Sequence, residues 1–267
     1  MAKKRNKPLE DSYFDLVIKT ILNEVYFPGE HVNEGRPLPK NPAMSMIGRS
    51  RLENVLSLAK EKIEQGIKGD FIEAGIWKGG VIALMSAVLN VYGDTSRQVY
   101  GADSFKGIPP AKPYLYPADK AHVGCDKLEI LSSNSRVEVE SLLQRFGLLS
   151  PQVTLVEGWF KDTLDNIPNE QFALIRLDGD SYESTMQGLQ ALYPKLSDGG
   201  SIIIDDYRSW HGCKVAVDEW RTKHHIKDPL IDIDWTAVYW TKLSKSGSSK
   251  IQLHRSMIEN FQNSLTS

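Results

Sequence analysis

Apolar residues in the first part of the chain recur at the spacing of an amphipathic helix. Within residues 12–27 they fall on Phe14, Val17, Ile18, Ile21, Leu22 and Val25, a pattern that indicates one buried helical face. A second run of this kind covers residues 49–65 and stops before Gly66. Residues 28–42, between the two runs, contain four prolines and two glycines and therefore predict an irregular loop.

From residue 69 onward, short apolar runs alternate with helical patterns. The runs that predict strands cover residues 70–74, 98–102, 153–156, 172–177 and 201–204. Helices are predicted from residue 80, over 136–146, from the fourth strand to 196, and over 212–225. Because continuously apolar strands alternate with helices, the sequence predicts an α/β fold whose parallel sheet is covered on both faces. Residues 231–240 alternate and predict an antiparallel pair at the sheet edge.

These patterns divide the chain into three segments. Residues 1–68 form an N-terminal helical segment that begins with a basic, solvated tail, residues 69–243 form the α/β domain, and residues 244–267 form a flexible C-terminal extension. The N-terminal helices are candidates for subunit contacts in a homodimer.

Composition narrows the classes of partner. The chain has 267 residues, and its 32 Lys and Arg against 34 Asp and Glu give a net charge of −2, which excludes a bulk nucleic-acid partner held by charge. Two cysteines without CxxC spacing exclude a disulfide scaffold and a zinc finger. The most apolar stretch is too short to cross a membrane, and the basic N-terminus has no apolar core behind it, so we expect a cytoplasmic protein.

A glycine-containing turn follows the first predicted strand. Glu73, Gly75 and Gly79 form an E-x-G-x-x-x-G turn before a helix, and in a doubly wound sheet the ligand crevice lies beyond such strand ends. The glycines allow a ligand to approach the backbone, and the helix N-terminus offers free N–H groups. The turn is neither the dinucleotide fingerprint nor a phosphate-binding loop. A purely structural tight turn is the alternative.

Two further strand ends carry residues suited to a nucleoside. Asp103 ends the second strand, where a carboxylate can accept the ribose hydroxyls, although it could equally cap the next segment. Gly158, Trp159 and Phe160 follow the third strand and offer aromatic surface for an adenine, with packing of the two rings in the core as the alternative.

Four carboxylates follow the fourth and fifth strands. Asp178, Asp180, Asp205 and Asp206 stand at strand tips that meet at one edge of the sheet, and such a cluster is costly unless a cation or proton offsets the repulsion. Oxygen ligands without His or Cys suit Mg²⁺, Ca²⁺ or Mn²⁺. For Asp180 the alternative is a helix cap, a role that Ser181 could also fill.

Taken in order, these segments resemble the TylF/macrocin O-methyltransferase family. The resemblance runs from about Tyr13 to Trp240 and is carried by FIEAGIWKGG, GADSFKGIPP, VEGWFKDTL, LIRLDGDSYESTMQGLQALYPKLSDGG and IIIDDYRSWHGCKVAVDEW. It implies a metal-dependent enzyme that transfers methyl from S-adenosylmethionine to a sugar hydroxyl of a natural product. The implied fold is a Rossmann-like class I methyltransferase: a seven-stranded, mostly parallel sheet with helices on both faces and an N-terminal helical lid. SMIGRSRLENV matches a family stretch that helps to close the site.

The resemblance also implies roles for individual residues. Asp178, Asp205 and Asp206 would bind Mg²⁺ or another divalent cation, Asp178 would also contact the methyl donor, and Asp180 would be the general base. The implied cofactor-binding residues are Glu73, Gly75, Trp77, Lys78, Gly79, Gly80, Asp103, Ser104, Gly158, Trp159, Phe160 and Asp178. The loops at 28–42 and 108–125 face the acceptor but match nothing that names it, and the tail beyond residue 244 extends past the family's sheet.

The expected chemistry is methylation of a metal-activated alcohol. A divalent cation acidifies and aligns the hydroxyl, and Asp180 takes its proton, with His211 in the loop after Asp206 as the rival base. We expect a small-molecule acceptor with a sugar hydroxyl, a catechol or another vicinal diol. The alternatives from other classes are a nicotinamide-dependent oxidoreductase and a non-catalytic cofactor-binding protein.

Overall fold

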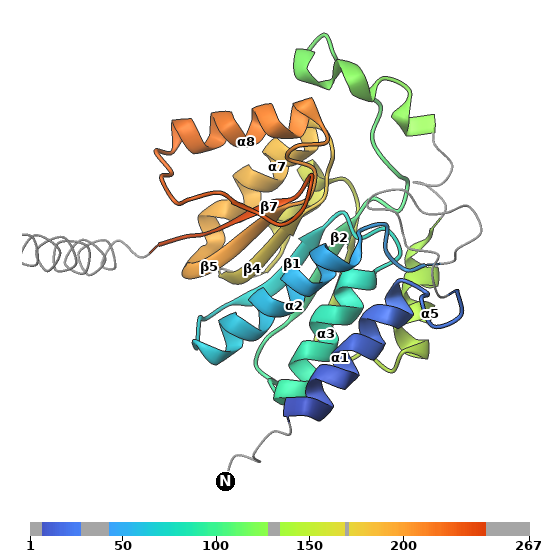
Figure 1. Ribbon diagram of the computed structural model, residues 1–267. Helices are drawn as coiled ribbons and strands as arrows, with labels where there is room; N and C mark the ends of the chain where they lie inside the picture. The colour runs from blue at the N-terminus through green and yellow to red at the C-terminus, as the bar shows by residue number, and fades with distance from the viewer. Residues whose placement is uncertain (1–6, 28–42, 128–133, 169–170, 244–267) are drawn as a thin grey trace, which may run out of the picture.

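A seven-stranded sheet forms the centre of the protein. The computed structural model describes residues 7–27, 43–127, 134–168 and 171–243, and its strand order is β3-β2-β1-β4-β5-β7-β6 (Figure 1). The strands are β1 Asp70–Ala74, β2 Val99–Asp103, β3 Val153–Glu157, β4 Phe172–Leu177, β5 Leu196–Ile204, β6 Ile231–Asp232 and β7 Val238–Thr241. β1 to β5 pair in parallel, whereas β7 runs antiparallel to both β5 and β6. The predicted α/β fold with an antiparallel edge is confirmed.

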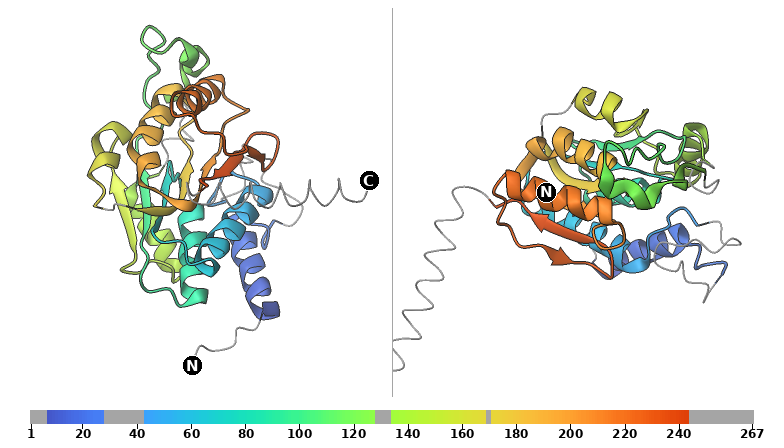
Figure 2. Two further views of the ribbon diagram at one scale, coloured as in Figure 1. Left: turned by 90° about the vertical axis from the view of Figure 1, so that its left-hand side faces the viewer. Right: turned by 90° about the horizontal axis from the view of Figure 1, so that it is seen from above.

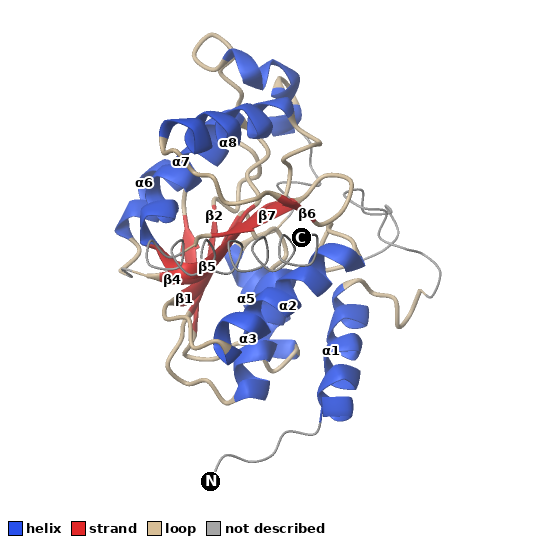
Figure 3. Ribbon diagram, turned by 60° about the vertical axis from the view of Figure 1, so that its left-hand side comes forward, coloured by secondary structure: helices blue, strands red, loops and turns tan. Residues whose placement is uncertain are grey.

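Helices cover both faces of this sheet (Figures 2 and 3). The helices on one face are α1 Lys7–Ile21, α2 Arg49–Glu64, α3 Gly80–Tyr92 and α5 Arg136–Arg145, and those on the other are α6 Phe160–Thr163, α7 Tyr182–Leu192 and α8 His211–Lys223. Short 3-10 turns complete the order: η1 Pro117–His122, η2 Cys125–Lys127, η3 Leu164–Asn166 and η4 Tyr193–Lys195.

The most apolar stretch of the sequence forms helix α3. Its residues from Gly80 to Leu89 are all buried, because the helix lies between the sheet and the layer formed by α1 and α2. A helix that is apolar on every side needs cover on every side, and here neighbouring elements provide it.

The largest differences from the predicted element boundaries lie in α1 and β5. Helix α1 begins at Lys7, before the predicted residue 12, because Pro8 is tolerated in a first helical turn. It ends at Ile21 rather than residue 27, because Asn23 adopts a left-handed backbone with φ 58°. Strand β5 begins at Leu196, five residues before the predicted start, and reaches Ile204 as predicted.

Helices α1 and α2 belong to the same hydrophobic core as the sheet. Phe14 of α1 and Leu52 of α2 are almost fully buried and share one core with Leu84 of α3 and Leu174 of β4. The division of the chain at residue 68 stays a prediction. The predicted loop 28–42, the basic tail and the extension from residue 244 lie outside the described residues, within which no helix is long and apolar enough to cross a membrane.

Candidate active site

A cavity of about 330 Å³ opens at the carboxyl ends of the central strands. The chain crosses from β1 toward β2 and β3 on one side, and continues through β4 and β5 on the other. This reversal of strand order is the topological switch point at which α/β sheets bind ligands. The lining residues are Met46, Gly75, Trp77, Asp103, Ser104, Gly107, Ile108, Pro109, Pro110, Lys112, Trp159, Phe160, Lys161, Asp178, Gly179, Asp180, Glu183, Ser184 and Gln187.

Gly75 brings the loops after β1 and β4 together. Its φ is +92°, and a Cβ on this residue would lie 1.9 Å from the carbonyl oxygen of Asp178. Only glycine fits both the backbone conformation and this approach. The turn therefore has a structural requirement, and it also forms part of the cavity wall.

Asp103 organises the same turn from the end of β2. One carboxylate oxygen accepts hydrogen bonds from the backbone N–H groups of Ile76 at 2.8 Å and Trp77 at 3.2 Å, and the other accepts one from Phe105 at 2.8 Å. Asp103 also lines the cavity. Because each carboxylate oxygen has two lone pairs, these backbone bonds leave capacity for a ligand hydroxyl.

The cavity gathers seven of the residues that the sequence suggested for a cofactor. They are Gly75, Trp77, Asp103, Ser104, Trp159, Phe160 and Asp178. The others lie beside or below it: Glu73, Lys78, Gly79, Gly80 and Gly158 are not among the lining residues. Gly79 precedes α3 with φ +78°, Gly80 donates its N–H to Met44, and the Lys78 amino group lies 4.4 Å from the Trp77 ring centre.

A long segment after β2 covers the outer end of the cavity. Lys112 of this segment forms an ion pair with Glu183 of α7, with Nζ 2.8 Å from Oε1. Further along, the Asp119 carboxylate accepts the backbone N–H groups of Tyr182 at 2.5 Å and Glu183 at 3.1 Å, at the start of α7. The sequence pointed to the 108–125 loop as facing the acceptor, but no pattern in it indicated these attachments.

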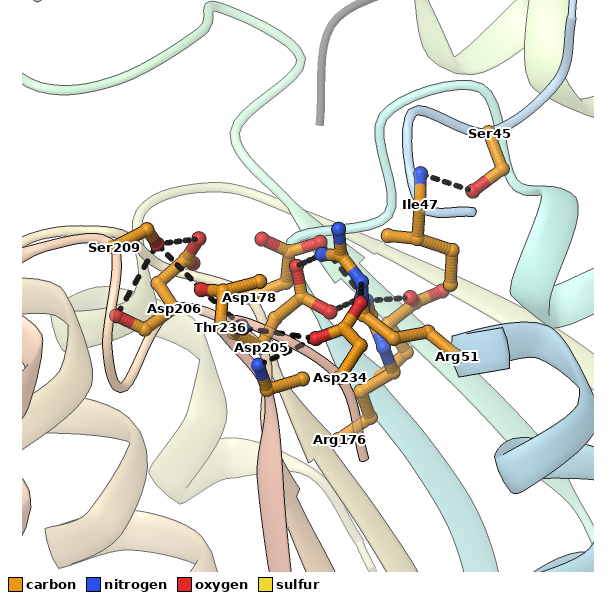
Figure 4. Close-up of polar contacts among 12 residues, drawn as sticks. Ser45, Ile47, Arg51, Arg176, Asp178, Asp205, Asp206, Ser209, Asp234 and Thr236 are labelled. Carbon is orange, nitrogen blue, oxygen red and sulfur yellow. Dashed lines mark hydrogen bonds and ion pairs between the residues drawn. The ribbon is translucent and has the colours of Figure 1, made fainter. Parts of the chain in front are cut away.

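Three carboxylates at the tips of β4 and β5 form one group, which we call the aspartate triad. Asp178, Asp205 and Asp206 offer carboxylate oxygens that all lie within 4.8 Å of one another (Figure 4). The Oδ2 atom of Asp206 is buried without a hydrogen-bond partner. Burial, followed by the nearby charges of Asp180 and Asp178, raises the pKa of Asp206 well above its ordinary value. An all-oxygen donor set with an unpartnered buried oxygen fits a hard divalent cation.

Two buried arginines, Arg51 and Arg176, contact the triad, and neither is among the site residues predicted from the sequence. Arg176, inside β4, donates to Asp178 at 2.9 Å, to Asp205 and to Glu73. Arg51, in the first turn of α2, donates to Asp205 and forms an ion pair with Asp234, with Nε 2.9 Å from Oδ2. The sequence signal for Arg176 was a charge inside an otherwise apolar strand. Arg51 lies within SMIGRSRLENV, the stretch whose family resemblance pointed to the site as a whole, but no local pattern pairs it with a carboxylate 154 residues away.

The arginines offset only part of the negative charge. The two arginines form ion pairs with four carboxylates, those of Glu73, Asp178, Asp205 and Asp234. Two further carboxylates, those of Asp180 and Asp206, lie next to this group. Glu73 contacts Arg176 and does not line the cavity. It is 2 % exposed, and this burial raises its pKa to about 8.

Asp180 stands in the cavity wall with an uncommon backbone. Its φ is 54°, a conformation that costs energy in a residue other than glycine. Burial, followed by the charges of Asp178 and Asp205, raises its pKa from 3.8 to about 8. The capping role falls to Ser181, whose hydroxyl accepts the N–H of Ser184 at 3.1 Å. Asp180 is therefore available to the cavity.

His211, the alternative candidate for the general base, lies in a helix and not in the predicted loop. His211 is the first residue of α8 and is exposed, rather than part of the preceding loop. Trp210, the residue before it, hydrogen-bonds Asp180 through its side chain.

Comparison with known proteins agrees with this architecture. The model of the family described as Macrocin-O-methyltransferase (TylF) matches residues 10–242. Demethyldecarbamoylnovobiocin O-methyltransferase of Streptomyces niveus is 40% identical over 245 residues, which cover 86% of this chain and 93% of that protein. The 8-demethyl-8-(2,3-dimethoxy-alpha-L-rhamnosyl)-tetracenomycin-C 4'-O-methyltransferase of Streptomyces olivaceus is 38% identical, and the match covers 90% and 95% of the two chains.

A solved structure shows the same fold. The O-methyltransferase NovP superposes with a TM-score of 0.83 at 40% identity, covering 88% of this chain and 100% of that one. With a family match over nearly the whole chain and relatives at this identity, the chain belongs to the TylF family of macrocin-O-methyltransferases and is an S-adenosylmethionine-dependent O-methyltransferase.

Proposed function

We propose that the protein methylates a sugar hydroxyl of a small glycosylated natural product, with Mg²⁺ or another divalent cation bound at the aspartate triad. The observation that carries the metal is the unpartnered, buried Oδ2 of Asp206 next to Asp178 and Asp205. The acceptor class is supported by two relatives, whose names give demethyldecarbamoylnovobiocin and a rhamnosyl-bearing tetracenomycin as their substrates.

The cavity residues divide into those for the methyl donor and those for the reaction. Gly75, Asp103 and Trp159 would hold the donor, through close backbone approach, ribose hydroxyls and an aromatic face. The triad would hold the cation, which favours the deprotonated form of a bound hydroxyl. Asp180, two residues after Asp178, would accept the hydroxyl proton. Its raised pKa makes it a stronger base than an ordinary aspartate.

The alternatives from other classes do not survive the family assignment. A nicotinamide-dependent oxidoreductase and a non-catalytic binding protein are both excluded by membership in a family of O-methyltransferases. A catechol or another vicinal diol remains the competing acceptor, because two adjacent hydroxyls satisfy the same chemistry.

Turnover assays test both parts of the proposal. The purified protein is stripped with EDTA and incubated with S-adenosylmethionine and a panel of glycosides and catechols, with and without added Mg²⁺, and methylated products are detected by mass spectrometry. We expect methylation of glycosides that depends on the added cation. Methylation that persists in EDTA would overturn the metal assignment, and turnover of catechols alone would overturn the sugar assignment.

A further inference from the structure

Arg51 occupies a place next to the triad that no step of the proposed reaction requires. It comes from α2, more than 150 residues before Asp205, and its side chain is 3% exposed. Its Nη1 donates to Oδ2 of Asp205, while Arg176 donates to Oδ1 of the same carboxylate. Both carboxylate oxygens of Asp205 therefore already accept a hydrogen bond from an arginine guanidinium.

We propose that the positive charge of Arg51 offsets the repulsion among the triad carboxylates when no metal is bound. When a cation binds at the triad, the same charge repels the cation and so lowers the affinity of the site for it. This inference rests on the proposed function, because it concerns the metal assigned to the triad. In Figure 4, Arg51 and Asp206 lie on opposite sides of the cluster, with Asp205 between them. A cation near Asp206 thus shares Asp205 with a positive charge on its far side.

The direction of the effect follows from what remains when Arg51 is removed. Asp205 would keep Arg176 on Oδ1, and its backbone N–H would still donate to Leu177 at 3.0 Å. Asp234 would stay in place because its Oδ1 accepts the N–H groups of Thr236 at 3.0 Å and Ala237 at 2.9 Å. The carboxylates would thus keep their positions while a positive charge is lost, which favours cation binding.

The contact also ties the N-terminal segment to the site. Arg51 lies in the first turn of α2, and the loop that precedes this helix carries Met46, a residue of the cavity wall. In that loop the hydroxyl of Ser45 accepts the N–H of Ile47 at 3.3 Å.

Loss of Arg51 leaves Asp205 and Asp234 with less positive charge nearby, so the metal-free protein loses stability.

The test compares Mn²⁺ affinity, measured by electron paramagnetic resonance, in full-length protein and its variants. For Arg51→Gln we expect the Mn²⁺ Kd to fall about tenfold or more, and Arg51→Lys, which keeps the charge, to stay close to wild type. Arg49→Gln is the matched control: it removes an arginine from the same helical turn, but Arg49 pairs with Asp15, Glu24 and Glu53 instead of the triad. Its Kd should not change.

Two further measurements keep the proposal testable if Arg51→Gln folds poorly without metal. Asp234→Asn removes a negative charge without touching Asp205, so it should weaken Mn²⁺ binding. In EDTA the Tm of Arg51→Gln should fall, and saturating Mn²⁺ should raise it by more than it raises the wild-type Tm.

The outcomes separate this inference from the proposed function. Unchanged or weaker Mn²⁺ binding in Arg51→Gln, with wild-type binding intact, would overturn the inference and leave the metal site standing. An absence of Mn²⁺ binding to the wild-type protein would contradict the metal assignment itself, and the inference with it.

Discussion

At the scale of single residues, the environment of Asp180 distinguishes it from its acidic neighbours. Asp178 and Asp205 form ion pairs with Arg176. Asp180 lines the cavity beside Asp178 but is hydrogen-bonded by the Trp210 side chain, and Ser181 rather than Asp180 caps α7. Its left-handed backbone, with φ 54°, stores strain that the loop between β4 and α7 must hold. Such strain at a cavity-lining acid is consistent with a role in the reaction.

Replacing Asp180 with Asn should remove the proton acceptor while preserving shape. We expect kcat to fall by about 100- to 10,000-fold, as for loss of a general base. Cofactor affinity, measured by calorimetry, should stay close to wild type. Mn²⁺ should still bind because the triad is intact, with an affinity lowered only by the loss of one nearby negative charge. Turnover near the wild-type rate would reject Asp180 as the base. His211→Gln, the control at the exposed rival, should have little effect on kcat.

The pH dependence of the reaction should report the same group. Its pKa is raised from 3.8 to about 8 by burial and by the charges of Asp178 and Asp205, so the basic form is lost at higher pH than in an ordinary aspartate. Turnover should therefore rise with pH. A cation bound at the triad lowers the pKa of Asp180, so the midpoint of the acid limb of the pH profile should lie between 3.8 and about 8. The residual rate of Asp180→Asn should lack this limb.

At the scale of elements, the site depends on how closely the loops after β1 and β4 approach each other. Gly75 permits the approach, and Asp103 from β2 fixes the turn through three backbone hydrogen bonds. The cavity wall is thus assembled from the ends of four neighbouring strands, because Trp159 and Phe160 after β3 also line it.

Gly75→Ala should disturb both stability and cofactor binding. The new Cβ meets a backbone carbonyl that cannot move aside, so we expect the free energy of unfolding to fall by at least about 3 kcal/mol, with weaker binding of S-adenosylhomocysteine. Gly66→Ala is the control, because Gly66 has φ +67° but nothing within 4 Å of a Cβ. It should cost only about 1–2 kcal/mol. Urea unfolding and calorimetry measure the two effects, and equal costs at both positions would argue against the clash.

At the scale of the whole molecule, the N-terminal helices and the sheet share one core. Leu52 of α2 is fully buried in the core on one face, and Leu192 of α7 is fully buried in the core on the other. Arg51 adds a polar attachment between α2 and the tip of β5. Both observations favour unfolding of all layers together.

Leu52→Ala and Leu192→Ala should therefore behave alike in urea. Each leaves a cavity in a packed layer and should cost about 2–5 kcal/mol, with a single transition that coincides by circular dichroism and tryptophan fluorescence. Two separate transitions in Leu52→Ala would show that residues 1–68 unfold as a unit of their own, as the predicted domain division implies.

The structural features that could be predicted from the sequence were those encoded by residues close together along the chain. Strands β1 and β4 and the start of α3 were predicted at their observed bounds, because continuous apolar runs and glycine turns are local signals. Four acids at two strand tips were expected to meet, because parallel strands end at one edge. Oxygens of three of them, Asp178, Asp205 and Asp206, lie within 4.8 Å of one another. The early start of α1 and the helical position of His211 were missed, because propensity at helix ends is weak.

The sequence by itself determined the fold class, the family and the acidic composition of the strand tips, since periodicity and motif order need no knowledge of distant contacts. Only the tertiary structure decided which charges meet. The expectation from the sequence was that a cation or a proton offsets the repulsion among the acids, but two arginines, Arg51 and Arg176, already contact Asp205. The physical reason is that electrostatic energy depends on distance in space, and the distance between α2 and the tip of β5 is set by packing across the whole core.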